Sequence, residues 1–380
     1  METIKMLHIA DVHIGARFLF LGERGGEQRL ALREALARVA RIAREERYHL
    51  LAVAGDLFDD AYEASDADVS FVIGCLQGAG PSCHVVILPS GHDPFSAGSI
   101  YERELKRFEA SGNVHVLAPG RRVIEIPELS LAVHGKALTS NVAAESALAG
   151  LAPIAGRRWN VCLAHCSVAG FSADLDPRDT PARLGDLAPG FDYVGLGHWH
   201  SYRVLQEKAP PVLYSGSPEI VARDQQGAGF AVSAALSAGG IAFERRAVGK
   251  RRVESRSIDC TGLASTEELV NRILGAVPPD PNVILGLSLG GLIGIDSALD
   301  PGAATGELER HYFSVRLAGK GPSREISREA LLAVPEETVA GALVRGMLKK
   351  IESSEGETRE LYEEALQLAY QLFKGRDLIG

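Results

Sequence analysis

The chain has 380 residues, a formal net charge of −9, 46% hydrophobic residues and 23% charged residues. This length is enough for two or three domains, because single hydrophobic cores stop growing at about 250 to 300 residues. The composition is that of a folded globular protein and excludes a disordered or fibrous one. The acidic balance also excludes a generally basic surface, so any nucleic-acid site must be local.

Membrane and redox signals are weak throughout the sequence. No apolar run reaches the roughly 20 residues that cross a bilayer, and Met1–Lys5 carries no signal-peptide pattern. The cysteines lack zinc-site spacing, which indicates reduced residues that serve packing. We therefore expect a cytoplasmic protein without membrane contact.

The first half of the chain alternates apolar runs with an amphipathic stretch. Glu27–Arg44 has one apolar face at helical spacing, which predicts a helix packed on a sheet. Short apolar runs favour buried parallel strands at Ile4–Ala10, Leu50–Ala54 and Val85–Leu88. The order strand, helix, strand is typical of an α/β fold.

The chain becomes dense in strand signals after Val114. Short apolar runs predict strands at Val114–Leu117, Val123–Ile126, Leu131–Val133, Val161–Ala164, Val194–Leu196 and Val212–Tyr214. Gly229–Leu236 and Ile241–Val248 then resemble two strands joined across a Gly-Gly turn. The pattern predicts an α/β sandwich of two sheets flanked by helices.

The charge rises around Lys250–Glu254, where we place a domain boundary. Beyond it, a smaller α+β domain is predicted from strand signals at Ser255–Asp259, Val283–Leu289 and Tyr312–Leu317 and a helix signal at Thr266–Val277. Two terminal helices are expected at Glu336–Glu352 and Glu357–Lys374. The expected parts are therefore residues 1–250, 251–320 and 321–380.

Several short segments place a His or an Asp directly after an apolar strand, and α/β sheets keep their sites at the carboxyl ends of strands. They are Asp11-Val12-His13, Gly55-Asp56-Leu57-Phe58-Asp59, Ser90-Gly91-His92-Asp93, Ala164-His165 and Gly197-His198-Trp199-His200. Each segment alone is a weak signal, because such motifs are common in turns and caps. Together, in this order, they predict a metal centre.

The spacing within the segments suits metal chelation. Alternate residues of an extended segment point the same way, so Asp11 and His13 can face one ion, as can His198 and His200. Asp56 is suited to bridge two cations about 3.5 to 4 Å apart, because a carboxylate offers two oxygens. Mixed imidazole and carboxylate ligands favour Mn²⁺, Fe²⁺ or Zn²⁺, and Mn²⁺ is the first choice because no cysteine joins the set.

These segments resemble the calcineurin-like metallophosphoesterases, whose pattern reads Asp-x-His, Gly-Asp-x-x-Asp, Gly-Asn-His-Asp, His and Gly-His-x-His. The resemblance covers about residues 4–235. Within it, Met6–Gly15, Ala54–Asp59 and Tyr214–Glu219 resemble the SbcD-type branch, the bacterial counterpart of a double-strand-break repair nuclease. The resemblance implies a two-sheet metallophosphoesterase sandwich with a smaller C-terminal cap domain for DNA ends at residues 251–320.

The resemblance also implies a role for each site residue. The implied metal ligands are Asp11, His13 and His200 for the first ion, His165 and His198 for the second, and Asp56 between them. His92 would be a catalytic residue rather than a ligand. It would lie over the scissile phosphate, where it steadies the transition-state charge or protonates the leaving oxygen.

One position departs from the family pattern, because Gly91 stands where an Asn is expected. The second ion would then need a water, a backbone carbonyl or the Ser90 hydroxyl instead. We expect a weaker second site, and activity that is low or needs high Mn²⁺. Asp59 and Asp93 are expected to hydrogen-bond loop amides or orient the histidines rather than to bind metal.

The predicted reaction is in-line attack on a phosphodiester by a metal-activated hydroxide, without a covalent enzyme intermediate. Because one fold can serve many substrates, three functions stay open. They are an Mn²⁺-dependent DNA exonuclease and endonuclease in double-strand-break repair, a phosphodiesterase for small substrates, and a non-catalytic repair scaffold with a weakened second site. The presence of both His92 and Asp56 counts against the scaffold.

The SbcD-type resemblance implies DNA ends as the substrate and an SMC-like ATPase of the SbcC type as the partner. Arg and Lys residues within 245–252 could then contact DNA phosphates. The last helix has an apolar set at helical spacing, which would pack on the cap or bind the partner's coiled coil: Leu361, Ala365, Leu368 and Leu372. Whether the chain forms a homodimer is left open.

Overall fold

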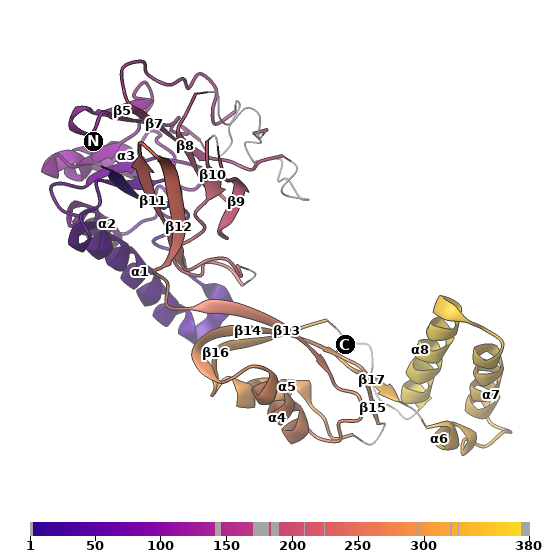
Figure 1. The fold of residues 1–380 in the computed structure, drawn as a ribbon. Coiled ribbons are helices and arrows are strands. Elements are labelled where there is room, and N and C mark those ends of the chain that lie inside the picture. Colours follow the sequence, from indigo (N-terminus) through magenta and orange to yellow (C-terminus); the bar gives the residue numbers. More distant parts are fainter. Residues whose placement is uncertain are drawn as a thin grey trace. The chain divides into compact units, whose positions relative to one another are not determined.

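The structure is a computed structural model. It describes residues 3–140, 146–169, 182–183, 190–208, 210–223, 225–294, 297–319, 321–325 and 327–373 (Figure 1). The chain divides into two compact units, Met1–Val253 and Glu254–Gly380. Lys374, the expected end of the last helix, lies outside the described residues.

One large sheet of the first unit has the strand order β12-β11-β1-β2-β3-β4. Its strands are β1 (Ile4–Ile9), β2 (Leu50–Val53), β3 (His84–Ile87), β4 (Val114–Val116), β11 (Phe230–Ser237) and β12 (Gly240–Ala247). Strands β1 to β4 run parallel, and the β11–β12 hairpin adds to β1 in the antiparallel direction. The predicted hairpin after Phe230 is therefore present, with Ser237 opposite Gly240 at the turn.

The other large sheet has the strand order β5-β6-β7-β8-β10-β9. Its strands are β5 (Val123–Ile126), β6 (Leu131–His134), β7 (Trp159–His165), β8 (Tyr193–Gly197), β9 (Arg203–Gln206) and β10 (Val212–Tyr214). One hydrophobic cluster joins residues of both sheets, among them Met6 and Val86 from the first and Val133 and Leu163 from the second. The predicted two-sheet α/β sandwich is confirmed.

Helices accompany the first sheet, and their bounds are α1 (Gly25–Glu45), α2 (Asp66–Gln77) and α3 (Ile100–Phe108), with short 3₁₀ turns at Leu19–Arg24 (η1), Glu109–Ser111 (η2) and Pro127–Leu129 (η3). Helix α1 buries the predicted apolar face, including Leu32, Leu36 and Val39. The sequence analysis did not assign α2 and α3. Ser65 and Ser99 cap them by accepting backbone N–H groups of their first turns.

The second unit begins with a small α+β part built on the strand order β13-β14-β16. Its elements are β13 (Arg252–Asp259), α4 (Thr266–Ala276), β14 (Asp280–Gly290), β15 (Leu292–Gly294), α5 (Pro301–Leu308), β16 (Tyr312–Ala318) and β17 (Ser323–Glu325). Leu269 and Ile273 of α4 pack with Leu285 of β14 in its hydrophobic core. The smaller C-terminal α+β part of the predicted fold is therefore present.

Terminal helices follow as α6 (Arg328–Leu332), α7 (Val339–Glu352) and α8 (Gly356–Phe373), with a hydrophobic cluster of their own. Helix α7 begins later than predicted, because Thr338 caps it by accepting the N–H of Gly341. In α8, the buried residues are Leu366 and Tyr370, whereas the predicted Leu361 is 63% exposed. The side chains of the predicted Leu368 and Leu372 lie outside those described.

Leu366 and Tyr370 of α8 pack with residues of α6 and α7, while Leu361 stays exposed. Packing on the cap or binding of a partner by the predicted apolar face stays a prediction. Over the described residues, every helix is too short or too polar to span a bilayer. The division into parts 1–250, 251–320 and 321–380, with a nuclease, a cap and a helical function, stays a prediction.

Candidate metal centre

The predicted site residues come from strand ends of both large sheets. Asp11 follows β1, Asp56 follows β2 and His92 follows β3. His165 is the last residue of β7, and His198 comes directly after β8. The sandwich therefore brings the carboxyl ends of five strands toward one place, as expected for an α/β site.

Backbone hydrogen bonds hold the first two loops together. The N–H of Asp11 donates to the carbonyl of Gly55 at 3.0 Å, and the N–H of His13 donates to the carbonyl of Asp56 at 3.0 Å. Asp11, His13, Asp56 and His198 have φ angles of 55°, 52°, 50° and 100°. Such angles in residues other than glycine cost of order 1–3 kcal/mol each and gather at functional sites.

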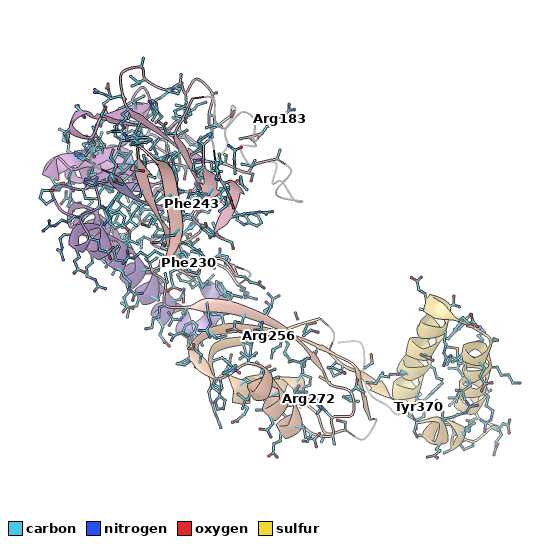
Figure 2. All side chains as sticks on the ribbon, viewed as in Figure 1. Arg183, Phe230, Phe243, Arg256, Arg272 and Tyr370 are labelled. Carbon is cyan, nitrogen blue, oxygen red and sulfur yellow. The ribbon has the colours of Figure 1, made fainter. Side chains whose placement is uncertain are left out.

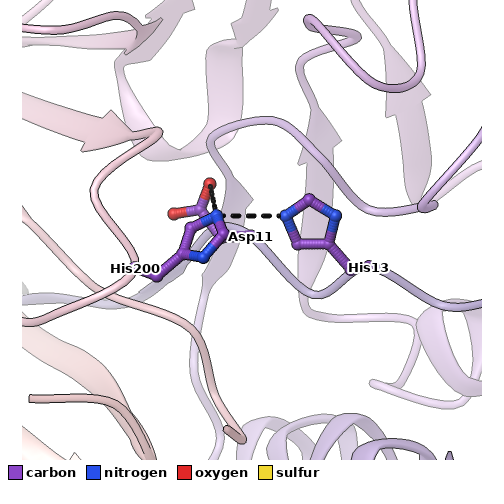
Figure 3. A group of neighbouring side chains, drawn as sticks. All are labelled: Asp11, His13 and His200. Atoms are coloured by element: carbon purple, nitrogen blue, oxygen red, sulfur yellow. Dashed lines mark hydrogen bonds and ion pairs between the residues drawn. The ribbon is translucent and has the colours of Figure 1, made fainter. Parts of the chain in front are cut away.

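Asp11, His13 and His200 form the first of the ligand groups (Figure 3). The Nε2 atoms of His13 and His200 are 3.2 Å apart, and Nε2 of His200 lies 3.9 Å from Oδ1 of Asp11. Oδ2 of Asp11 is buried without a hydrogen-bond partner among the described residues. A buried acceptor costs free energy when unpaired, so this donor set fits a cation.

Asp11, Asp56 and His165 form a second group of potential ligands. Nε2 of His165 lies 3.2 Å from Oδ2 of Asp56, and Nδ1 of His165 donates to the carbonyl of Ala54 at 3.0 Å. That hydrogen bond fixes the ring and leaves Nε2 to face the carboxylate. Small residues are required here, because a Cβ atom at Gly55 would lie 2.3 Å from Nδ1 of His165.

The two oxygens of Asp56 have different surroundings. Oδ2 faces His165 and also Nε2 of His13, at 3.8 Å. Oδ1 instead accepts hydrogen bonds from the Ser90 hydroxyl at 2.5 Å and the His92 N–H at 3.0 Å. The sequence predicted that Asp56 bridges two ions through both of its carboxylate oxygens. In the structure one oxygen, Oδ2, faces the imidazoles of both groups.

His92 lies at the solvent edge of the cluster and belongs to a third group with His13 and Asp56. Its ring centroid is 4.8 Å from that of His13, and its side chain is exposed. Nδ1 of His92 donates to the carbonyl of Asp59 at 2.9 Å. This contact holds the ring with its Nε2 edge turned away from the loop.

His198 is placed differently from the other predicted ligands. Its N–H donates to Oδ1 of Asp11 at 2.8 Å, and its ring centroid is 5.4 Å from that of His165. None of the ligand groups found among the described residues includes His198. The structure therefore brings its ring beside His165, while its part as a ligand stays a prediction.

Burial and charge together shift the pKa values of the cluster. Burial disfavours the charged form of His165, but the Asp56 carboxylate outweighs this effect and raises the pKa of His165 to about 10. Burial likewise opposes ionisation of Asp56, yet the charges of His165 and His13 hold its pKa well below the usual value. Burial raises the pKa of Asp11 and lowers that of His200. The buried carboxylates thus depend on nearby positive charge, which a divalent cation would also supply.

Gly91 leaves the expected place of an Asn side chain open. A Cβ atom built at Gly91 meets no described atom within 4 Å. The neighbouring Ser90 is fully buried, and its hydroxyl accepts from the N–H of Asp56 at 2.7 Å while it donates to Oδ1 of Asp56. Of the replacements considered for the missing ligand, the Ser90 hydroxyl is thus already engaged.

Asp59 and Asp93 have the supporting contacts that the sequence suggested. Oδ1 of Asp59 is 3.2 Å from Nδ1 of His13, a contact that orients the ring. Asp93 is fully buried and accepts from the N–H of Leu57 at 2.9 Å and the hydroxyl of Tyr101 at 2.7 Å. Burial and the Asp56 charge raise the pKa of Asp93 to about 6.

Gln225 was missed by the sequence analysis. Its side-chain amide contacts Nδ1 of His200, and its Oε1 accepts the N–H of Val221 at 2.8 Å. Gln225 is 5% exposed and lies 25 residues from His200 in sequence. No motif surrounds it, so nothing in the sequence pointed to this contact.

Residues 4–202 match the protein family described as calcineurin-like phosphoesterase. Among known proteins, a relative from Saccharolobus solfataricus described as DNA double-strand break repair protein Mre11 is 25% identical over 232 residues, which are 58% of this chain and 56% of that protein. A protein from Aeropyrum pernix with the same description is 28% identical over 227 residues, 56% of this chain and 53% of its own length.

A third relative, from Bacillus subtilis, is described as uncharacterized metallophosphoesterase YhaO and is 26% identical over 237 residues, 58% of this chain and 54% of its own length. The chain thus spans about half the length of the curated relatives it matches. Among solved structures, the protein TT1561 of Thermus thermophilus is similar with a TM-score of 0.40 and 12% identity, covering 65% of this chain and 100% of its own.

Proposed function

Because the chain belongs to the calcineurin-like phosphoesterase family, we propose that it is a Mn²⁺-dependent DNA nuclease that acts in double-strand-break repair. The observation that carries the proposal is Oδ2 of Asp56, which faces His165 at 3.2 Å and His13 at 3.8 Å. One carboxylate oxygen between two sets of imidazoles is suited to a pair of cations. The two relatives described as double-strand break repair proteins support DNA as the substrate.

We assign the ligands as the family pattern implies: Asp11, His13 and His200 to the first ion, His165 and His198 to the second, and Asp56 to both. When bound, two such ions lower the pKa of a water molecule and stabilise charge on the reacting phosphate oxygens. The donor set of imidazoles and carboxylates supports Mn²⁺ as the ion. Gly91 leaves the second site short of one ligand, so we propose that this site is the weaker.

The protein's own residues orient the reacting groups in this scheme. Asp59 and the Ala54 carbonyl fix the rings of His13 and His165 through their Nδ1 atoms. Nδ1 of His92 is held by the Asp59 carbonyl, so its Nε2 is available to the substrate. We propose that His92 is a catalytic residue that donates a hydrogen bond to a phosphate oxygen or a proton to the leaving oxygen.

The basic residues proposed to contact DNA are fewer than the sequence suggested. Arg246 forms a salt bridge with Glu46, and Arg251 is only 5% exposed. Arg245 lies over the rings of Tyr202 and Phe230, the latter labelled in Figure 2. We therefore propose that Arg245 and Lys250 contact phosphates, with the cap at 251–320 contributing to binding of DNA ends.

We propose an SMC-like ATPase of the SbcC type as the partner and the terminal helices as its binding surface. Val339 and Leu343 of α7 are 83% and 40% exposed, and Leu361 and Phe373 of α8 are 63% and 48% exposed. Large apolar side chains at such exposure support a helical partner, which would cover them. A cytoplasmic location, as predicted from the sequence, agrees with a DNA substrate.

The proposal is tested by Mn²⁺-dependent cleavage of end-labelled linear duplex DNA, with circular single-stranded DNA as a substrate for endonuclease activity. A chromogenic phosphodiester is tested in parallel, because the small-substrate alternative predicts turnover of that ester alone. Asp56→Ala should abolish cleavage. DNA binding without hydrolysis by both wild type and Gly91→Asn, at every Mn²⁺ concentration, would favour the scaffold that the open space at Gly91 suggests.

A further inference from the structure

The connection between β10 and β11, described at residues 215–223 and 225–229 and called the 215–229 loop below, contacts the backbone and the side chain of His200. The N–H of Ser217 donates to the carbonyl of His200 at 2.9 Å, and the amide of Gln225 contacts its Nδ1. Close by, the N–H of Tyr202 donates to the carbonyl of Gly227 at 2.9 Å. The position of this imidazole therefore depends on the 215–229 loop.

The same loop carries a buried carboxylate, Glu219, that is 0% exposed. Oε2 of Glu219 accepts the N–H of Lys250 at 2.7 Å, and both oxygens lie 3.3 Å from the N–H of Arg251. Oε1 also accepts the N–H of Ile220 at 2.9 Å and the side-chain amide of Gln28 at 3.3 Å. A buried carboxylate is tolerated only with such partners, so the pairing to residues 250 and 251 is obligatory for this fold.

Further contacts fasten residues 248–251 to the loop. The carbonyl of Gly229 accepts the N–H groups of Val248 and Gly249, both at 2.9 Å. Helix α1 also holds this segment, because the guanidinium of Arg38 donates to the carbonyl of Val248 at 2.7 Å. A Cβ atom at Gly249 would lie 2.6 Å from Cα of Gly229, so the two backbones are in direct contact.

Residues 248–251, which these contacts hold, end directly before β13. Strand β13 starts at Arg252, directly after the clamped residues, and the second compact unit starts at Glu254. The 215–229 loop is thus bound at one side to a proposed metal ligand and at the other to residues 248–251, which directly precede β13.

We propose that Glu219 is a positioning residue that couples residues 250–251, at the root of β13, to the orientation of His200. The proposal rests on the proposed function only in taking His200 as a metal ligand. Glu219 acts through the 215–229 loop and does not contact metal or substrate. A displacement of the root of β13 would move the loop and change the metal affinity of the site, because hydrogen bonds at both ends of the path are joined by the backbone of the loop.

The test is Glu219→Gln, which keeps the size of the side chain but replaces one acceptor oxygen by an NH₂ group. The amide can no longer accept from all the N–H groups that the carboxylate pairs. Changes in groups that orient metal ligands typically lower metal affinity about 10- to 100-fold. Glu219 acts on His200 through the loop rather than by direct contact, so we expect a smaller loss of Mn²⁺ affinity, about three- to tenfold. The affinity is measured on the full chain by electron paramagnetic resonance of free Mn²⁺.

A double-mutant cycle identifies the route of the effect. Gln225→Met removes the contact to His200 directly, so Glu219→Gln should weaken Mn²⁺ binding little further in that background. Asn113→Leu is the matched control, because Asn113 is 4% exposed and its amide donates to the carbonyls of Gly80 and Cys83, outside the loop. It should lower stability to urea and leave Mn²⁺ affinity unchanged.

The side-chain NMR signal of His200 in metal-free protein, assigned through its loss in His200→Asn, gives a second readout. Glu219→Gln should shift this signal and Asn113→Leu should not. Wild-type affinity with an unshifted signal in Glu219→Gln would overturn the coupling while leaving the proposed function intact. Equal losses of affinity from Glu219→Gln in both backgrounds would also overturn it. A shifted His200 signal in Glu219→Gln, together with a wild type that binds no Mn²⁺, would support the coupling and refute the proposed function.

Discussion

Nε2 of His165 lies 3.2 Å from Oδ2 of Asp56, and the same oxygen faces Nε2 of His13 at 3.8 Å. One oxygen of Asp56 therefore faces both sides of the candidate centre. Its other oxygen is held by Ser90 and by the N–H of His92. The side chain cannot rotate away from the imidazoles without breaking both of these hydrogen bonds.

Asp56→Asn should remove binding of both ions and lower DNA cleavage by about a hundredfold or more, because it takes the shared charge from the site. The measurements are the Mn²⁺ stoichiometry by elemental analysis and the cleavage rate. Asp60→Asn is the matched control, since Asp60 only accepts the N–H groups of Tyr62 and Glu63 in its own turn. Two bound Mn²⁺ ions in Asp56→Asn would contradict the bridging role.

Gly91→Asn should strengthen the second metal site. A Cβ atom at Gly91 meets no described atom within 4 Å, so an Asn side chain can begin there without a clash. We expect the Mn²⁺ concentration for half-maximal cleavage to fall about tenfold, because the amide oxygen adds a ligand of the type Mn²⁺ accepts. Mn²⁺ titration of the cleavage rate measures this change.

Gly91→Leu controls for bulk, because leucine matches asparagine in length but offers no oxygen. It should leave the Mn²⁺ requirement as in the wild type or raise it. If the Asn and Leu variants have the same Mn²⁺ requirement, the weaker second site is not explained by the missing Asn.

His92→Gln should lower the cleavage rate about 10²- to 10⁴-fold, the range for loss of a general acid or base. Mn²⁺ affinity should stay within about twofold of the wild type, because His92 is proposed to act on the substrate rather than to bind metal. His84→Gln is the control, because His84 begins β3 and so lies at the opposite end of that strand from the carboxyl end that leads to His92. Parallel losses of rate and of Mn²⁺ affinity in His92→Gln would instead make His92 a ligand.

The strand-end positions of the site followed from the sequence because they depend on local features. The predominantly apolar runs of β1 and β2 indicate buried parallel strands, and residues after such a strand lie at the site edge of the sheet. The sequence therefore sufficed to predict that Asp11, His13 and Asp56 lie close together. It did not predict that one oxygen of Asp56 is held by Ser90, because that depends on a third loop.

Long-range contacts were beyond sequence reasoning. Glu219 pairs with Lys250, 31 residues away, and Gln225 with His200. Neither Lys250 nor Gln225 is marked by a motif. Helix α2, in contrast, could have been predicted. Its buried face has helical spacing, and Ser65 precedes it as a cap; the buried residues are Val69, Val72, Ile73 and Leu76.

A last prediction concerns His8, a buried histidine in β1 outside the proposed ligand set. His8 is 0% exposed and its Nδ1 is 3.1 Å from the hydroxyl of Tyr193. Burial lowers the pKa of His8 from 6.5 to about 3, against a backbone hydrogen bond at Leu196 that raises it. The folded protein therefore keeps this imidazole neutral at pH values where the unfolded chain binds a proton.

Stability must then fall as the pH drops below about 6.5, since the unfolded state takes up a proton that the folded state does not until about pH 3. Between pH 7 and pH 5 the loss of stability due to His8 is about 2 kcal/mol, at about 1.36 kcal/mol for each unit of pH below 6.5. Urea unfolding with a chelator at both pH values should show a loss in free energy of unfolding that is about 2 kcal/mol smaller in His8→Gln than in the wild type. All other titrating groups are common to both proteins and cancel in the comparison. An equal loss in the two proteins would mean that His8 carries a proton in the folded state at pH 5.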